Sequence, residues 1–150
     1  MISERISVRI ESDSDLVVAR AEARGLAEAL GFTRTDATLL ATAVSEITRN
    51  IIIHAGSGSI EMTPLYSDTR YGLRVVATDR APGIRDADVA LEEGYAGRGG
   101  LGLGLPGVRR LVDEFEIETE LDEGTTVTLI KWRVRDELER LRDRRGNDPR

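Results

Sequence analysis

The sequence predicts an α/β (α+β) sandwich, in which a mixed β-sheet is covered by helices on one face. Two observations lead to this fold class. Several short runs alternate apolar and polar residues, whereas two long stretches repeat apolar residues at helical spacing. The elements follow the order strand, helix, helix, strand, strand, loop, helix, strand, strand, which gives the helices a sheet to pack against. A length of 150 residues suits one domain with one core.

The first half of the chain predicts one strand and two helices. Residues 5–10 alternate apolar and polar side chains, as a half-buried strand does. Apolar residues recur at helical spacing over 15–30, and Gly31 follows where a helix C-cap belongs. Thr35 is expected to cap a second, longer helix that runs to about Ala55.

The second half predicts a glycine-rich loop between strands. Four runs alternate as strands do: residues 59–65, 71–78, 114–121 and 125–132. Residues 79–104 are expected to be mostly loop, with a short helical possibility at 86–91. A helix is expected at 105–112, because Pro106 suits a first turn. We therefore expect one domain over residues 1–135 and a charged tail, 136–150, that is either a solvated helix or frayed.

Composition excludes several classes of function. The chain has no cysteine, which excludes disulfides, thiolate metal sites and a thiol nucleophile. A net charge of -6 and an aromatic content of 4% argue against nucleic acid as a partner. The N-terminus has no apolar leader and no run is long enough to cross a bilayer, so we expect no membrane contact and a cytoplasmic location.

The first candidate site lies on the second expected helix. At about 100° per residue, Glu46, Asn50 and His54 fall within about 80° of one another and interleave with the apolar face. Buried polar groups need partners or a ligand, so a cavity explains the pattern. Alternatively, Glu46 and Asn50 lie at the rim of the stripe and only bond to loops, while His54 caps the helix end. An Asn oxygen suits Mg²⁺, and a Glu one turn away can reach a hydroxyl beside the metal.

The second candidate site begins where an apolar strand is expected to end, at Asp79. A carboxylate at the C-terminal end of a strand points into a crevice, and Gly83 lets the backbone approach a flat ligand closely. Taken alone, the pattern from Asp79 to Ile84 is more often a turn.

The third candidate site is a loop with seven glycines in the fourteen residues 94–107. Such a loop offers backbone N–H groups to phosphate, and the following helix adds a partial positive charge at its N-terminus. The alternative is a mobile loop, which is also compatible with a lid. The pattern Gly102-x-Gly104-x-x-Gly107 matches a dinucleotide fingerprint, but no strand leads into it, so we discount that site.

In this order, the three clusters resemble the motifs of the GHKL ATPase superfamily, whose ATP-binding domain is the Bergerat fold. The matching motifs are the N box at Glu46-x3-Asn50-x3-His54, the first glycine box at Asp79 to Ile84, the lid and second glycine box at Gly97 to Gly104, and a last motif at Gly124-Thr125-Thr126. Gyrase, Hsp90 and MutL are far longer, and histidine kinases carry a dimerisation domain that bears their phosphoacceptor His, so we expect none of these branches of the superfamily. The chain looks most like the anti-sigma-factor-like serine/threonine kinases, of the RsbT-type that acts in bacterial stressosome pathways.

The resemblance implies an ATP-dependent serine/threonine protein kinase. Glu46 would be the catalytic base, Asn50 would hold Mg²⁺ on the ATP phosphates, and Asp79 would accept from the adenine amino group. The other residues implied in nucleotide binding are His54, Gly83, Ile84, Gly97, Arg98, Gly99, Gly100, Leu101, Gly102, Leu103, Gly104 and Thr126. Ala81 stands where the family motif usually has its first glycine.

The same resemblance implies protein partners in a stress-response switch. The substrate would be a STAS-domain antagonist or scaffold protein, and the second partner a PP2C-type phosphatase or a sigma factor. The rival interpretation is a non-catalytic nucleotide-binding module that sequesters a sigma factor or activates a phosphatase. Glu46 and Asn50 together favour the enzyme, because a scaffold has no chemical need for an inward carboxylate. A metal-dependent hydrolase built on His54 is disfavoured, because no ligand set clusters around it.

Overall fold

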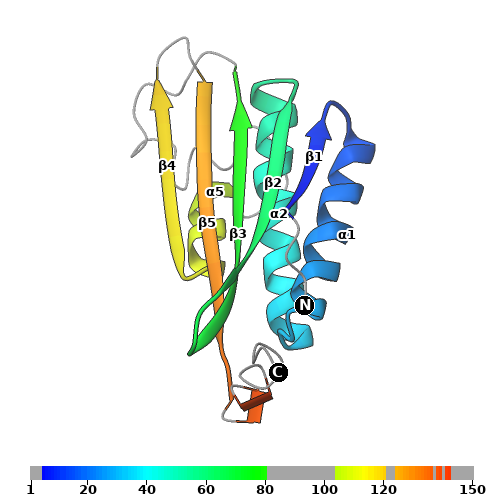
Figure 1. The fold of residues 1–150 in the computed structure, drawn as a ribbon. Helices are drawn as coiled ribbons and strands as arrows, with labels where there is room; N and C mark the ends of the chain where they lie inside the picture. Colours follow the sequence, from blue (N-terminus) through cyan, green and yellow to red (C-terminus); the bar gives the residue numbers. More distant parts are fainter. Residues whose placement is uncertain (1–4, 81–103, 121–123, 137, 140, 143–150) are drawn as a thin grey trace.

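The described part of the chain folds into five strands and three helices (Figure 1). The computed structural model describes residues 5–80, 104–120, 124–136, 138, 139, 141 and 142. Its elements are β1 (Ile6–Ile10), α1 (Asp13–Ala29), α2 (Arg34–His54), β2 (Gly58–Tyr66), β3 (Arg70–Asp79), α5 (Gly104–Leu111), β4 (Glu114–Glu120) and β5 (Gly124–Val134). Each expected strand and long helix is present, and the short helical possibility at 86–91 lies outside the described residues.

The strands form one sheet in the order β1-β2-β3-β5-β4. All four described pairings are antiparallel, so the expectation of a mixed sheet was wrong in this respect. The antiparallel packing of the two long helices explains why β2 runs antiparallel to β1. Because α1 and α2 run in opposite directions (Figure 1), α2 ends near the end of the sheet where β1 finished, and β2 must run back beside it.

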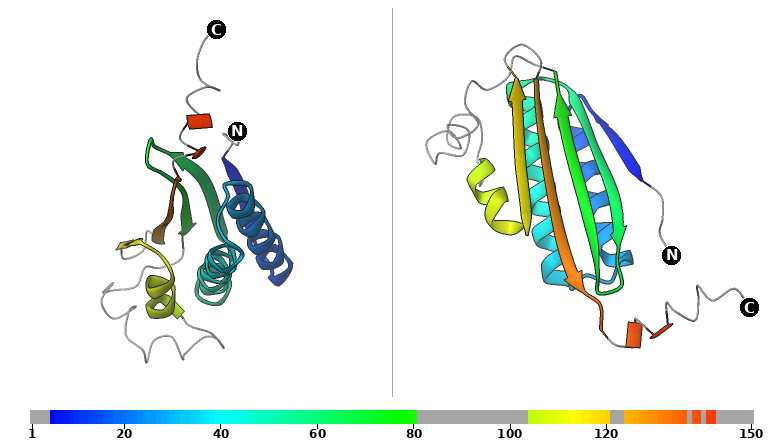
Figure 2. Two further views of the ribbon diagram at one scale, coloured as in Figure 1. Left: turned by 90° about the horizontal axis from the view of Figure 1, so that it is seen from below. Right: turned by 60° about the vertical axis from the view of Figure 1, so that its left-hand side comes forward.

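All three helices cover the same face of the sheet, as Figure 2 shows in its right-hand view, which confirms the expected layering. Strand side chains alternate accordingly. On β3, Leu73 and Val75 are buried under the helices, whereas Arg74 between them is exposed on the opposite, open face. The largest fully buried side chains are Ile10, Leu40, Ile47, Ile60, Met62, Leu73 and Leu129. The core is therefore aliphatic, as the low aromatic content requires.

Both long helices begin with hydrogen-bonded caps. The Asp15 carboxylate accepts the backbone N–H groups of Glu11 (2.8 Å) and Ser12 (3.1 Å), so α1 begins two residues earlier than expected. The N-cap of α2 is Thr33, whose hydroxyl accepts the backbone N–H of Asp36 at 3.1 Å. The expectation that Thr35 caps this helix was wrong, because Thr35 lies inside its first turn. None of the described helices is long and apolar enough to cross a membrane.

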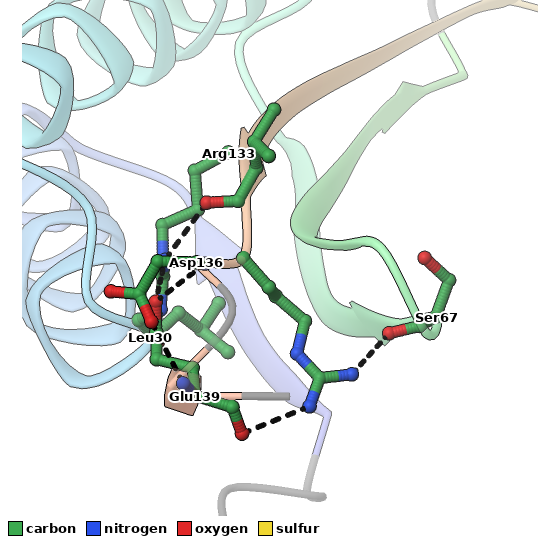
Figure 3. Close-up of polar contacts among 7 residues, drawn as sticks. Leu30, Ser67, Arg133, Asp136 and Glu139 are labelled. Carbon is green, nitrogen blue, oxygen red and sulfur yellow. Dashed lines mark hydrogen bonds and ion pairs between the residues drawn. The ribbon is translucent and has the colours of Figure 1, made fainter. Parts of the chain in front are cut away.

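Two arginines at the end of β5 hold the start of the tail against the rest of the fold (Figure 3). Arg133 donates to the backbone carbonyl of Leu30 at 2.6 Å and to both carboxylate oxygens of Glu139. Arg135 donates to the Ser67 carbonyl at 2.6 Å. The hydrogen bond from Arg133 lowers the pKa of Glu139 to about 2. The tail therefore begins as an anchored segment, helical at residues 138, 139, 141 and 142, and the domain boundary at residue 135 stays a prediction.

Candidate active site

Glu46 lies in the middle of α2 and is buried, with 8% of its surface exposed. One carboxylate oxygen accepts a hydrogen bond from the Arg49 guanidinium at 3.0 Å, and the other accepts from the backbone N–H of Gly104 at 3.4 Å. Gly104 is the first residue of α5, so the carboxylate faces the positive end of a helix dipole. Glu46 is thus fixed at the junction of α2 and α5.

Asn50 follows Glu46 by one helical turn and carries an unsatisfied polar atom. Its side-chain nitrogen is buried and has no hydrogen-bond partner within the described part of the chain. Buried amide groups are nearly always paired, so this nitrogen needs an acceptor from outside the described residues. A phosphate oxygen is such an acceptor, while the side-chain oxygen of Asn50 is a ligand of the kind that Mg²⁺ prefers. The residues present therefore fit a magnesium-bound nucleotide.

His54 does not share this buried environment. It is the last residue of α2 and is exposed. Of the three N-box residues, the structure thus buries Glu46 and the amide nitrogen of Asn50, and it leaves His54 at the rim.

Asp79 is the last residue of β3 and lies in the middle of the sheet. Gly58 of β2 pairs with it on one side and Thr125 of β5 on the other. A Cβ atom on Gly124, which has a φ of +108°, would collide with the Asp79 backbone carbonyl. A Cβ atom on Gly58 would likewise collide with the backbone carbonyl of Thr78. The two glycines let neighbouring backbones approach closely, and this fixes the end of β3.

The register of β5 separates two adjacent threonines. Thr126 pairs with Thr78, whereas Thr125 pairs with Asp79. Since side chains alternate along a strand, Thr125 shares the helix-covered face with Asp79, and Thr126 shares the open face with Thr78. The Thr125 hydroxyl lies 3.2 Å from that of Thr119 on β4. The sequence motif predicts Thr126, whereas counting back in twos from the buried Leu129 and Val127 places Thr125 on the helix-covered face.

The N-terminal half of α5 is buried against the rest of the fold. Gly104, Leu105, Pro106, Gly107 and Val108 are all buried, and Gly104 has a φ of +64°. At the other end of the helix, the Lys131 ammonium donates to the Leu111 carbonyl at 3.0 Å, where a cation also complements the helix dipole. These contacts fix the N–H of Gly104 opposite Glu46. The other glycine-loop candidates, Gly97 to Leu103, and the residues Gly83, Ile84 and Ala81 lie outside the described residues.

A family model, the histidine kinase-like ATPase domain, matches residues 10–131, which include the three described helices, the strands β2, β3 and β4, most of β5 and every described candidate residue. The chain belongs to the histidine kinase-like ATPase family. It is 41% identical over 131 residues to the serine/threonine-protein kinase RsbT of Bacillus subtilis (strain 168), a match that covers 87% of this chain and 98% of RsbT. The expected class, an ATP-using protein kinase of the RsbT type, is confirmed by these two matches.

Two solved structures share the fold. The RsbU and RsbW domains of Rv1364c from Mycobacterium tuberculosis align with a TM-score of 0.59 and 19% identity, over 88% of this chain and 33% of that one. The mycobacterial sensor histidine kinase MprB aligns with a TM-score of 0.51 and 17% identity, over 89% of this chain and 99% of that one. At this identity the likeness shows the fold alone.

Proposed function

We propose that this chain transfers the γ-phosphoryl group of ATP to a serine or threonine hydroxyl of a STAS-domain protein in a cytoplasmic partner-switching pathway, with Mg²⁺ held at Asn50. The observation that carries the proposal is the buried Glu46 carboxylate, fixed by Arg49 and by the first N–H of α5. It lies one turn from an amide nitrogen that has no partner among the described residues. A PP2C-type phosphatase or a sigma factor is the proposed second partner.

In this mechanism Glu46 accepts the proton of the substrate hydroxyl. The hydroxyl oxygen forms a bond to the γ-phosphorus, the bond from that phosphorus to the β,γ-bridging oxygen breaks, and ADP leaves. Arg49 and the Gly104 N–H hold the carboxylate in place, so little reorganisation is needed when the proton moves. Mg²⁺, when bound, would neutralise charge on the phosphates. Asn50 contributes its side-chain amide to the phosphate end of the nucleotide.

The adenine end is proposed to lie at Asp79, whose carboxylate would accept from the adenine amino group. Thr125 shares the face of Asp79 and is proposed to join its hydrogen-bond network. Gly83 and Ile84 beside the adenine, His54 at the rim, and residues 97–103 around the phosphates stay predictions from the sequence motifs.

The experiment is a phosphoryl-transfer assay with γ-labelled ATP, Mg²⁺ and the STAS-domain proteins encoded near the gene. Wild type should label one of them. Glu46→Gln should lower the rate by about 100-fold or more and keep its affinity for ATP, because the loss of a general base costs about that much. Glu22→Gln, an exposed carboxylate on α1, is the matched control. A Glu46→Gln variant as fast as wild type would remove the assigned base, and ATP binding without any transfer would favour the rival binding module.

A further inference from the structure

A cavity of about 530 Å³ lies between the two long helices, lined by exposed residues of α1 and by buried and half-buried residues of α2. We call it the α1–α2 groove. Its lining residues are Arg20, Ala21 and Arg24 of α1, and Ala41, Thr42, Ser45, Glu46 and Arg49 of α2. The small side chains among them leave space between the helices, and the volume lies within the range of ligand-binding pockets.

The groove is strongly basic although the whole chain carries a net charge of -6. Three arginines line it, and Glu46 is the one carboxylate among its lining residues. Glu46 already pairs with Arg49. Arg20 and Arg24 are exposed, one turn apart, and pair with no carboxylate within the described residues. Two guanidinium groups are thus available to an anionic ligand, and guanidinium binds carboxylates with two parallel hydrogen bonds.

Exposed apolar residues lie one helical turn from two of the three lining arginines, Arg20 and Arg49. Val17 precedes Arg20 by one turn of α1 and is 53% exposed, and Ile53 follows Arg49 by one turn of α2 and is 43% exposed. A protein segment that carries both acidic and apolar side chains would therefore find complementary groups here, whereas a small free anion would use the arginines alone.

Glu46 connects the groove to the nucleotide site. Its side chain lines the groove, and its carboxylate also accepts from the backbone N–H of Gly104, the first residue of α5. A hydroxyl that enters from the groove therefore meets the proposed base directly.

We propose that the α1–α2 groove binds an acidic segment of the substrate protein and presents the neighbouring serine or threonine hydroxyl to Glu46. This inference rests on the proposed function and adds the recognition chemistry: carboxylates near the acceptor residue pair with Arg20 and Arg24. It predicts that the two arginines determine the choice of protein substrate and leave ATP affinity unchanged.

The first test is charge reversal. Arg20→Glu/Arg24→Glu should lower kcat/KM for the labelled STAS-domain protein by about tenfold or more, mainly through a higher KM, with the Kd for ATP unchanged. The matched control is Arg9→Glu/Arg74→Glu, which changes the net charge equally on the open face of the sheet, where both side chains are exposed. Wild-type kinetics for the Arg20/Arg24 variant would overturn the proposal, as would an equal loss in the control pair.

The second test does not depend on catalysis. Wild-type protein labelled with ¹⁵N is titrated with the acetylated peptide Asp-Asp-Ser-Asp-Leu and, separately, with Asn-Asn-Ser-Asn-Leu. The acidic peptide should shift the Nε–H signals of Arg20 and Arg24 and the backbone signal of Ser45, and the amide peptide should not. Equal shifts with both peptides, or none at millimolar concentration, would overturn the groove proposal. Because no ATP is present, this result stands even if the phosphoryl-transfer assay contradicts the proposed function.

Discussion

At the residue scale, the alternation of strand side chains decides which threonine accompanies Asp79. Thr125 and Thr126 are adjacent and chemically identical, and a motif match alone does not separate them. The pairing of Asp79 with Thr125 does, because it places both on the helix-covered face. A hydroxyl there can bond to a ligand beside the Asp79 carboxylate, whereas Thr126 lies on the other side of the sheet.

This difference predicts the behaviour of two nearly isosteric variants. Thr125→Val should weaken ATP binding by about fivefold to tenfold, the usual consequence of losing one buried hydrogen bond. Thr126→Val should leave the affinity within about twofold. Isothermal titration calorimetry measures both Kd values. A larger loss of ATP affinity in Thr126→Val than in Thr125→Val would contradict the proposal that Thr125 lies beside the nucleotide. It would favour Thr126, the residue that the sequence motif predicts.

Gly124 is a second position where one residue type is required. Gly124→Ala should destabilise the fold by more than about 1 kcal/mol, because alanine strains at positive φ and its Cβ would strike the Asp79 carbonyl. Gly25→Ala is the matched control: it lies inside α1 with open space around it, and should stabilise by about 0.5–1 kcal/mol. Urea unfolding measures both. Equal stability of the two variants would contradict the close packing at the end of β3.

At the element scale, hydrophobic periodicity located the long helices and the strands, since each buries one face against the core. The ends of helices were harder to place. Thr33 and Thr35 both have the chemistry of an N-cap, and only the three-dimensional path of the chain decides that Thr33 lies outside the helix and accepts from Asp36. The α1–α2 groove was not predicted either. Arg20 and Arg24 look like an ordinary solvated helix face until α2 packs beside them.

The cap assignment predicts a stability difference between two similar variants. Thr33→Ala should lower the free energy of unfolding by about 1 kcal/mol, because a backbone N–H of α2 loses its acceptor. Thr35→Ala, an exposed change within the first turn, should have less than half that effect. Thermal and urea unfolding give the two values, and a larger cost for Thr35→Ala would show that the cap is misplaced.

At the scale of the whole molecule, the sheet order β1-β2-β3-β5-β4 joins segments that are far apart in sequence. No local pattern encodes which strands become neighbours, so the mixed sheet expected from the element order became an antiparallel one. The same long-range packing places the end of β5 against the turn between the two long helices, through Arg133 and Leu30 (Figure 3). Burial of Glu46 followed from its position on the apolar stripe of α2, but its contact with Gly104 needed the fold.

The anchored tail predicts a pH-dependent contribution to stability. The pKa of Glu139 falls from 4.5 to about 2 in the folded chain, so its contact with Arg133 stabilises the fold fully above about pH 4.5 and loses this effect as the pH falls toward 2. Glu139→Gln should be less stable than wild type by up to about 1 kcal/mol at pH 7, as for a partly exposed ion pair. The difference should shrink at pH 3 and below. Urea unfolding at pH 7 and pH 3 measures this difference in stability, and the exposed change Glu28→Gln is the control. A stability difference between Glu139→Gln and wild type that does not depend on pH would contradict the prediction.

Calorimetric titration of Asn50→Ala with ATP, with and without Mg²⁺, tests whether the buried stripe of α2 holds a magnesium-bound nucleotide. Wild type should bind ATP more tightly with Mg²⁺ than without, and Asn50→Ala should lose about tenfold or more of the affinity measured with Mg²⁺. Thr38→Ala, an exposed change on the same helix, should bind as wild type does. If Asn50→Ala binds ATP with the wild-type Kd and the same dependence on Mg²⁺, the phosphates of the nucleotide do not lie beside Asn50.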